Sequence, residues 1–101
     1  MIFQIVHTHS NETCPSQSAE QANRFAEWWK SVKQTPGIKV LAGYVSSMDH
    51  TFYITVEADD YPTVVKAFGA LNTWGTGRTS PVLTIDQTIP WAKAGTFRAS
   101  K

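Results

Sequence analysis

The chain opens with an apolar run, residues 2–6, that ends in a His-Thr-His motif. Alternate residues of a strand point to opposite faces, so a strand here would place His7 and His9 on the same face as Ile5. A buried ring nitrogen that lacks a partner costs about 1–3 kcal/mol. Two adjacent histidines at the end of an apolar strand face therefore need a metal ion or hydrogen-bond partners in the core.

The remaining chain alternates helix and strand patterns. Apolar residues recur every three or four positions up to residue 33, which predicts a helix that starts either near Pro15 or later, with Ser18 and Gln21 as a capping box. The other predicted elements are strands over residues 38–45 and 51–57, a second helix capped by Asp59 or Asp60, a loop over residues 72–78 and a fourth strand over residues 81–89 that Pro90 ends.

This order of elements is the ferredoxin-like split βαβ pattern, βαββαβ. It predicts an α+β fold whose four-stranded antiparallel sheet carries two helices on one face. With this order and size, the chain resembles the dimeric α/β-barrel superfamily, which includes muconolactone-isomerase-like proteins and small cofactor-free monooxygenases. The resemblance implies a homodimer or higher oligomer and a cavity for a small molecule. It covers residues 1–90 as one domain, and the tail, residues 91–101, has no clear period and is a candidate for packing on a partner subunit.

The third histidine of the chain belongs to the same end of this sheet. In the split βαβ pattern the strand at residues 51–57 runs antiparallel beside the first strand, which brings His50 next to His7 and His9. Three neutral imidazoles with an open fourth position are typical of a catalytic metal site. The sequence thus predicts that His7, His9 and His50 bind one transition metal ion, with iron, copper, nickel and zinc all suitable.

Three further residues are candidates for catalysis. Glu12 and Cys14 follow the first strand directly, so each could add a ligand, and Glu12 could act as a base on bound water. Cys14 precedes Pro15 near a helix start, where backbone N–H groups favour a thiolate. Tyr53 is expected on the opposite face of the sheet, where its phenol could orient a ligand in a cavity between two packed sheets.

A non-metal interpretation stays open. A His-x-His pair occurs on many strands without metal, and Cys14 could be a small buried hydrophobe. Trp28 falls off the stripe of the first helix, which favours a place at a partner interface or in a ligand pocket. Trp74, in the predicted loop, could cover a cavity. The glycines of that loop follow a helix and precede a strand, the wrong order for a dinucleotide fingerprint, so no nucleotide cofactor is expected.

Composition excludes several classes of function. Nine Lys and Arg residues balance eight Asp and Glu residues without clustering, which argues against nucleic acid as a partner. No apolar run is long enough for a membrane span or a signal peptide, and one cysteine cannot form an internal disulfide, so a cytoplasmic protein is expected. Twelve per cent aromatic residues exceed what one small core hides, which favours a dimer interface or an aromatic pocket.

Together these observations predict a metal-binding, homodimeric enzyme that acts on a small molecule as an oxygenase, isomerase or lyase. Two alternatives remain. One is a cofactor-free isomerase or monooxygenase in which histidine and tyrosine side chains move protons. The other is a module without catalytic activity that binds a ligand or forms oligomers.

Overall fold

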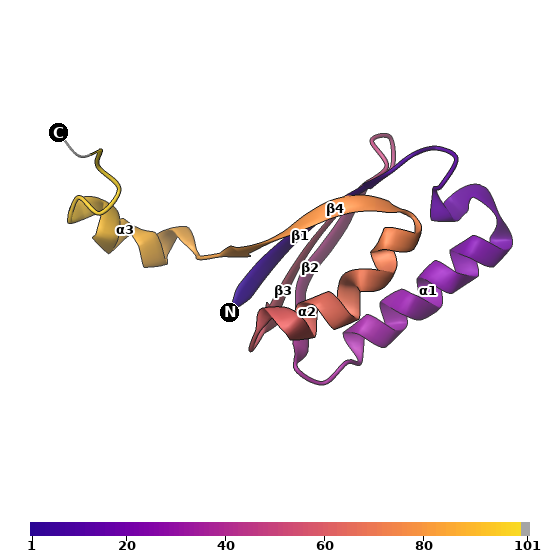
Figure 1. Ribbon diagram of the computed structural model, residues 1–101, viewed down its shortest axis with the longest axis horizontal. Helices are drawn as coiled ribbons and strands as arrows, with labels where there is room; N and C mark the ends of the chain where they lie inside the picture. The colour runs from indigo at the N-terminus through magenta and orange to yellow at the C-terminus, as the bar shows by residue number, and fades with distance from the viewer. Residues whose placement is uncertain (100–101) are drawn as a thin grey trace.

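The computed structural model describes residues 1–99 of the chain (Figure 1). Its elements are β1 (Ile2–His9), a 3₁₀ turn η1 (Pro15–Gln17), α1 (Ala19–Lys33), β2 (Ile38–Ser46), β3 (Thr51–Ala58), α2 (Tyr61–Phe68), a second 3₁₀ turn η2 (Gly69–Thr73), β4 (Gly75–Val82) and α3 (Ile85–Lys93).

The four strands form one antiparallel sheet in the order β2-β3-β1-β4, and α1 and α2 cover one of its faces (Figure 1). Alternate residues of β1 are buried beneath the helices, as the period of two predicted. Phe3 and Ile5 join the apolar core, and His7 and His9 continue the same row. The predicted ferredoxin-like α+β fold is confirmed.

The pairing of β1 with β3 brings the histidines to one end of the sheet. His7 lies opposite Phe52, and Thr8 lies opposite Thr51. Beyond this ladder the backbone N–H of His9 donates to the carbonyl of His50 at 3.0 Å. The predicted neighbourhood of the first and third strands is therefore confirmed.

The predicted position of the fourth strand is wrong. The strand occupies Gly75–Val82, so it begins inside the segment expected to be a loop and shares only residues 81 and 82 with the predicted range 81–89. Most of its residues are small or polar, so apolar and polar residues do not alternate along the strand. Only its hydrogen-bonded pairing with β1 identifies it as a strand. Pro81 is tolerated because β4 is an edge strand and its residues need hydrogen-bond partners on one side only.

The C-terminal prediction is also corrected. Residues expected to be strand and irregular tail form α3, in which Thr84 and Gln87 make a capping box and Pro90 lies inside the helix instead of ending a strand. Within residues 1–99, α3 buries none of its side chains and projects away from the sheet (Figure 1). The radius of gyration is 16.4 Å, whereas a compact chain of this length has about 13 Å.

Two tryptophans lie inside the chain's own helical layer, contrary to the sequence interpretation. Trp28 packs between α1 and α2, and its indole N–H donates to the carbonyl of Ala67 at 3.0 Å. Trp74 is buried, and its indole N–H donates to the side-chain oxygen of Gln21 at 3.1 Å. Trp74 is therefore a core residue and covers no cavity described here. Trp28 is held by the packing of α1 on α2, and it also borders a surface cleft between these helices.

Two glycines of β4 let this strand approach the histidine end of β1. A Cβ atom on Gly77 would meet the carbonyl of Val6 and lie 2.9 Å from the Cα of His7. We expect Gly77→Ala to lower the free energy of unfolding by about 1–3 kcal/mol, because the backbone must shift to admit the methyl group. Urea unfolding measures this change.

Gly69 supplies the matched control. A Cβ atom at Gly69 meets nothing within 4 Å, and its φ of −58° suits any residue. Gly69→Ala should leave stability unchanged or raise it slightly. Equal stabilities of the Gly77→Ala and Gly69→Ala proteins would contradict the close approach of β4 to β1.

Candidate metal centre

Three potential metal ligands from separate segments meet at the end of β1. His9 ends the strand, Cys14 lies in the following loop, and His50 lies in the turn between β2 and β3. One ligand atom from each residue lies within 4.8 Å of the other two. Two imidazoles and a thiol therefore form a candidate metal centre.

His9 is buried in a form that suits metal binding. Its side chain is 6% exposed, and among the described residues its Nδ1 atom has no hydrogen-bond partner. Burial lowers the pKa of His9 below its ordinary value, and the nearby His7 and His50 lower it further. The ring is therefore neutral near pH 7, with a lone pair free to bind a metal ion.

His50 lies in a hydrogen-bonded turn between β2 and β3. Its φ of +51° lies in the left-handed region, which is unfavourable for most residues other than glycine. Neighbouring bonds hold this conformation: the Ser46 hydroxyl donates to the Asp49 carboxylate at 2.9 Å, and the Thr51 hydroxyl donates to the Asp49 carbonyl at 3.0 Å. The rings of His50 and His9 then lie 5.3 Å apart, edge to face.

Cys14 is half-buried at the start of η1, and the carbonyl of Cys14 accepts from the backbone N–H of Gln17 at 3.0 Å. Its Sγ atom and the Ser16 hydroxyl form a hydrogen bond at 2.9 Å. The main helix α1 begins later than Cys14, with the Ser18 side chain as its cap. Loop geometry and Ser16 therefore orient the thiol toward the histidines, and α1 is not involved.

The three ligands open into a cleft of about 250 Å³. Its other lining residues are Pro15, Ser16, Ala22, Phe25, Val45, Ser47 and Phe52. The cleft is thus polar at the ligand end and mostly apolar elsewhere, which is typical of small-molecule sites.

His7 lies outside the three-ligand group. Its ring is 2% exposed and stacks on Phe52, and its Nε2–H donates to the carbonyl of Leu71 at 2.8 Å. Burial lowers the pKa of His7, and the bond to Leu71 partly opposes this effect. The remaining nitrogen, Nδ1, is buried and has no partner within residues 1–99. His7 therefore connects β1 to η2, the segment that follows α2.

The structure places the other two candidates apart from the cleft lining. Glu12 is exposed in the loop that leads to Cys14. Tyr53 is 41% exposed on the sheet face opposite the histidines, beside Tyr44 of β2. Glu12 lies close to the ligands in the chain, whereas Tyr53 belongs to another surface.

Sequence reasoning missed the aromatic side of the cleft. Phe25 lies on the first helix and Phe52 on the strand β3, and the two rings stack 4.9 Å apart in the lining of the cleft. Gly43, which lies against Trp29, was also missed. Phe25 and Trp29 are four residues apart, and this spacing in the sequence could have indicated that both rings share one face of the helix. The position of Gly43 opposite them depends on sheet register, which the sequence does not reveal.

The fold and the clustered ligands define a ferredoxin-like α+β domain with a candidate metal centre. No helix in the described part of the chain is both long and apolar enough to cross a membrane. Residues 1–96 match the family model described as domain of unknown function DUF3303, so the chain belongs to this family. No curated protein and no solved structure matches the chain.

The roles of His7 and the three clustered residues can be separated by substitution. His7→Leu keeps the core filled but leaves the carbonyl of Leu71 without its donor. We expect the free energy of unfolding to fall by about 1–3 kcal/mol in urea denaturation, with metal content unchanged. An unaltered stability would contradict the structural role, and loss of metal would place His7 among the ligands.

Proposed function

We propose that this protein binds one transition metal ion through His9, Cys14 and His50. The observation that supports this proposal is the meeting of three ligand atoms within 4.8 Å. Around a tetrahedral ion with bonds of 2.0–2.3 Å, such atoms lie about 3.5 Å apart. In this proposal, small side-chain rotations bring the three ligand atoms from within 4.8 Å to about 3.5 Å of one another.

The set of donors favours particular metals. A thiolate with two neutral imidazoles suits zinc and copper, and iron and nickel are also compatible, whereas magnesium and calcium require oxygen ligands. We also propose a cytoplasmic location, where an unpaired thiol such as that of Cys14 stays reduced.

We further propose that the metal centre is catalytic and acts on a small molecule. Three protein ligands leave a coordination position for water or substrate, and the ligands border a cleft of about 250 Å³. A bound metal ion would supply Lewis-acid or oxygen-activating chemistry there. In this scheme Cys14 is a ligand, and Glu12, on the adjacent loop, supplies the base for a proton of the bound molecule.

The test is metal analysis of purified, untagged protein after reconstitution with zinc, copper, iron and nickel in separate samples. We expect about one ion per chain for at least one of these metals. His9→Ala, Cys14→Ser and His50→Ala should each reduce retention at least tenfold, because a three-ligand site loses one donor.

His7→Leu is the matched control, since it removes a buried histidine two residues from His9 without removing a proposed ligand. The control protein should retain the ion. Full occupancy in all three ligand variants, or no uptake of any of the four metals by the original protein, would refute the proposed site.

We also propose that the protein is a homodimer in which α3 packs on the partner subunit. The C-terminal arm, residues 83–99, exposes five large apolar side chains: Leu83, Ile85, Ile89, Trp91 and Phe97. A nine-residue helix with an internal proline is marginally stable alone in water. The arm therefore requires a surface that its own domain does not provide.

A second copy of the chain offers such a surface. The sheet face opposite α1 and α2 exposes Tyr44 and Tyr53, which pair across β2 and β3. Exchange of arms between two copies would bury both the arm and this face. The resemblance to dimeric α/β barrels supports the same arrangement, in which Tyr53 would line a cavity between the two sheets.

Sedimentation equilibrium tests the dimer. The mass should be twice the chain mass of 11.2 kDa. Ile85→Asp should shift the protein toward monomer, because this side chain is 79% exposed in one copy and would be buried in two. Met48→Asp is the control, since Met48 is 93% exposed at the turn between β2 and β3. A monomeric original protein would refute the arm exchange.

A further inference from the structure

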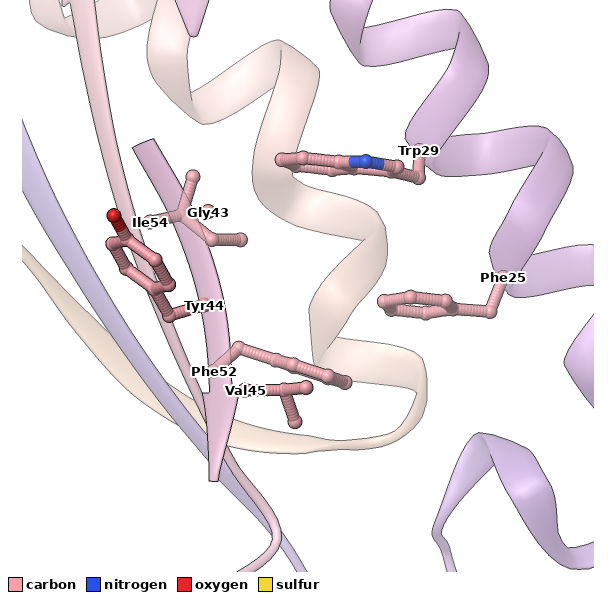
Figure 2. A pocket seen from close by; sticks show the side chains of 7 residues that line it. All are labelled: Phe25, Trp29, Gly43, Tyr44, Val45, Phe52 and Ile54. Atoms are coloured by element: carbon pink, nitrogen blue, oxygen red, sulfur yellow. The ribbon is translucent and has the colours of Figure 1, made fainter. Parts of the chain in front are cut away.

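A second cavity lies beside the candidate metal centre, between α1 and the strands β2 and β3 (Figure 2). Its volume is about 150 Å³. We call it the aromatic chamber, and its lining residues are Phe25, Trp29, Gly43, Tyr44, Val45, Phe52 and Ile54.

The walls of the aromatic chamber are flat. Figure 2 shows the rings of Trp29 and Phe25 projecting from α1 toward the sheet, one above the other, with Gly43 and Ile54 on the opposite side. Phe52 stacks on Phe25 with an interplanar angle of 19°. A planar guest between the ring of Trp29 and the stacked rings of Phe25 and Phe52 would meet ring faces on both sides. These contacts would have the offset or tilted geometry that aromatic rings favour.

Volume and polarity both favour one kind of guest. An apolar cavity of about 150 Å³ is large enough to accept benzene. A stable internal water needs two to four polar partners, and apart from tyrosine and tryptophan every lining side chain is a hydrocarbon. The hydroxyl of Tyr44 points away from α1 (Figure 2). The chamber therefore fits a single six-membered ring.

The aromatic chamber adjoins the metal cleft, because Phe25, Val45 and Phe52 line both cavities. We infer that the substrate is a small molecule with a single aromatic ring, which lies in the chamber with a polar substituent directed toward His9, Cys14 and His50. The identification of this molecule as a substrate depends on the proposed metal-dependent function, but its binding in the chamber does not.

Gly43 determines the size of the aromatic chamber. A Cβ atom on Gly43 would lie 2.9 Å from Cζ2 and 3.0 Å from Cη2 of Trp29. Any side chain here must displace the indole or occupy the space of the guest. We therefore assign Gly43 and Trp29 as residues that set ligand specificity.

The experiment uses phenol as the probe and metal-free protein, so that metal coordination cannot contribute. Ligand-observed NMR titration gives the affinity, and nuclear Overhauser effects between phenol and the indole protons of Trp29 locate the site. We expect saturable binding and contacts to Trp29. Gly43→Ala should weaken phenol binding at least fivefold, whereas Gly69→Ala, with open space around its Cβ position, should leave it unchanged.

Phenol binding to the original protein tests the inference even if the Gly43→Ala protein does not fold. Absence of saturable phenol binding, contacts to a site other than Trp29, or equal affinities of the folded Gly43→Ala protein and the original protein would overturn the inference. Phenol binding without metal uptake would support the chamber and refute the metal proposal. Metal uptake without phenol binding would overturn the chamber alone.

Discussion

The pairing of β1 with both of its neighbours is the constraint on which the structure depends. This strand lies inside the sheet, between β3 and β4, so its backbone groups are bonded on both sides. Its inner face is covered by helices, which buries His7 and His9 in the same row as the apolar core. Burial lowers the pKa of both rings and favours their neutral forms. His7 then donates to the carbonyl of Leu71, and His9 belongs to the candidate metal centre.

Close approach of the backbone makes room for the large rings. Gly75 and Gly77 allow β4 to lie against the histidine end of β1, and Gly43 allows the indole of Trp29 to lie against β2. In each case a Cβ atom would collide with a neighbouring chain segment or ring. The packing at the histidine end of β1 and the aromatic chamber therefore both depend on strand positions that carry no side chain.

Local patterns predicted much of the fold but failed at the C-terminus. The alternation in β1 and β3 and the stripe of α1 identified those elements, because burial of one face imposes a period on the sequence. In β4 the residues are small and polar, and an edge strand needs only backbone partners, so no period marks it. The capping box at Thr84 did mark the start of α3, but the preceding strand was placed across it.

The sequence by itself determined which side chains share a face of β1 and that His50 belongs to the same end of the sheet, because strand periodicity and element order are local properties. Only the tertiary structure decided between the two histidines of β1: η2 supplies a carbonyl to His7, whereas the loop after β1 supplies Cys14 to His9. The aromatic chamber also arises only in three dimensions, since Gly43 meets Trp29 through the packing of α1 on the sheet. Such contacts join segments that are distant in the chain, so no local sequence pattern predicts them.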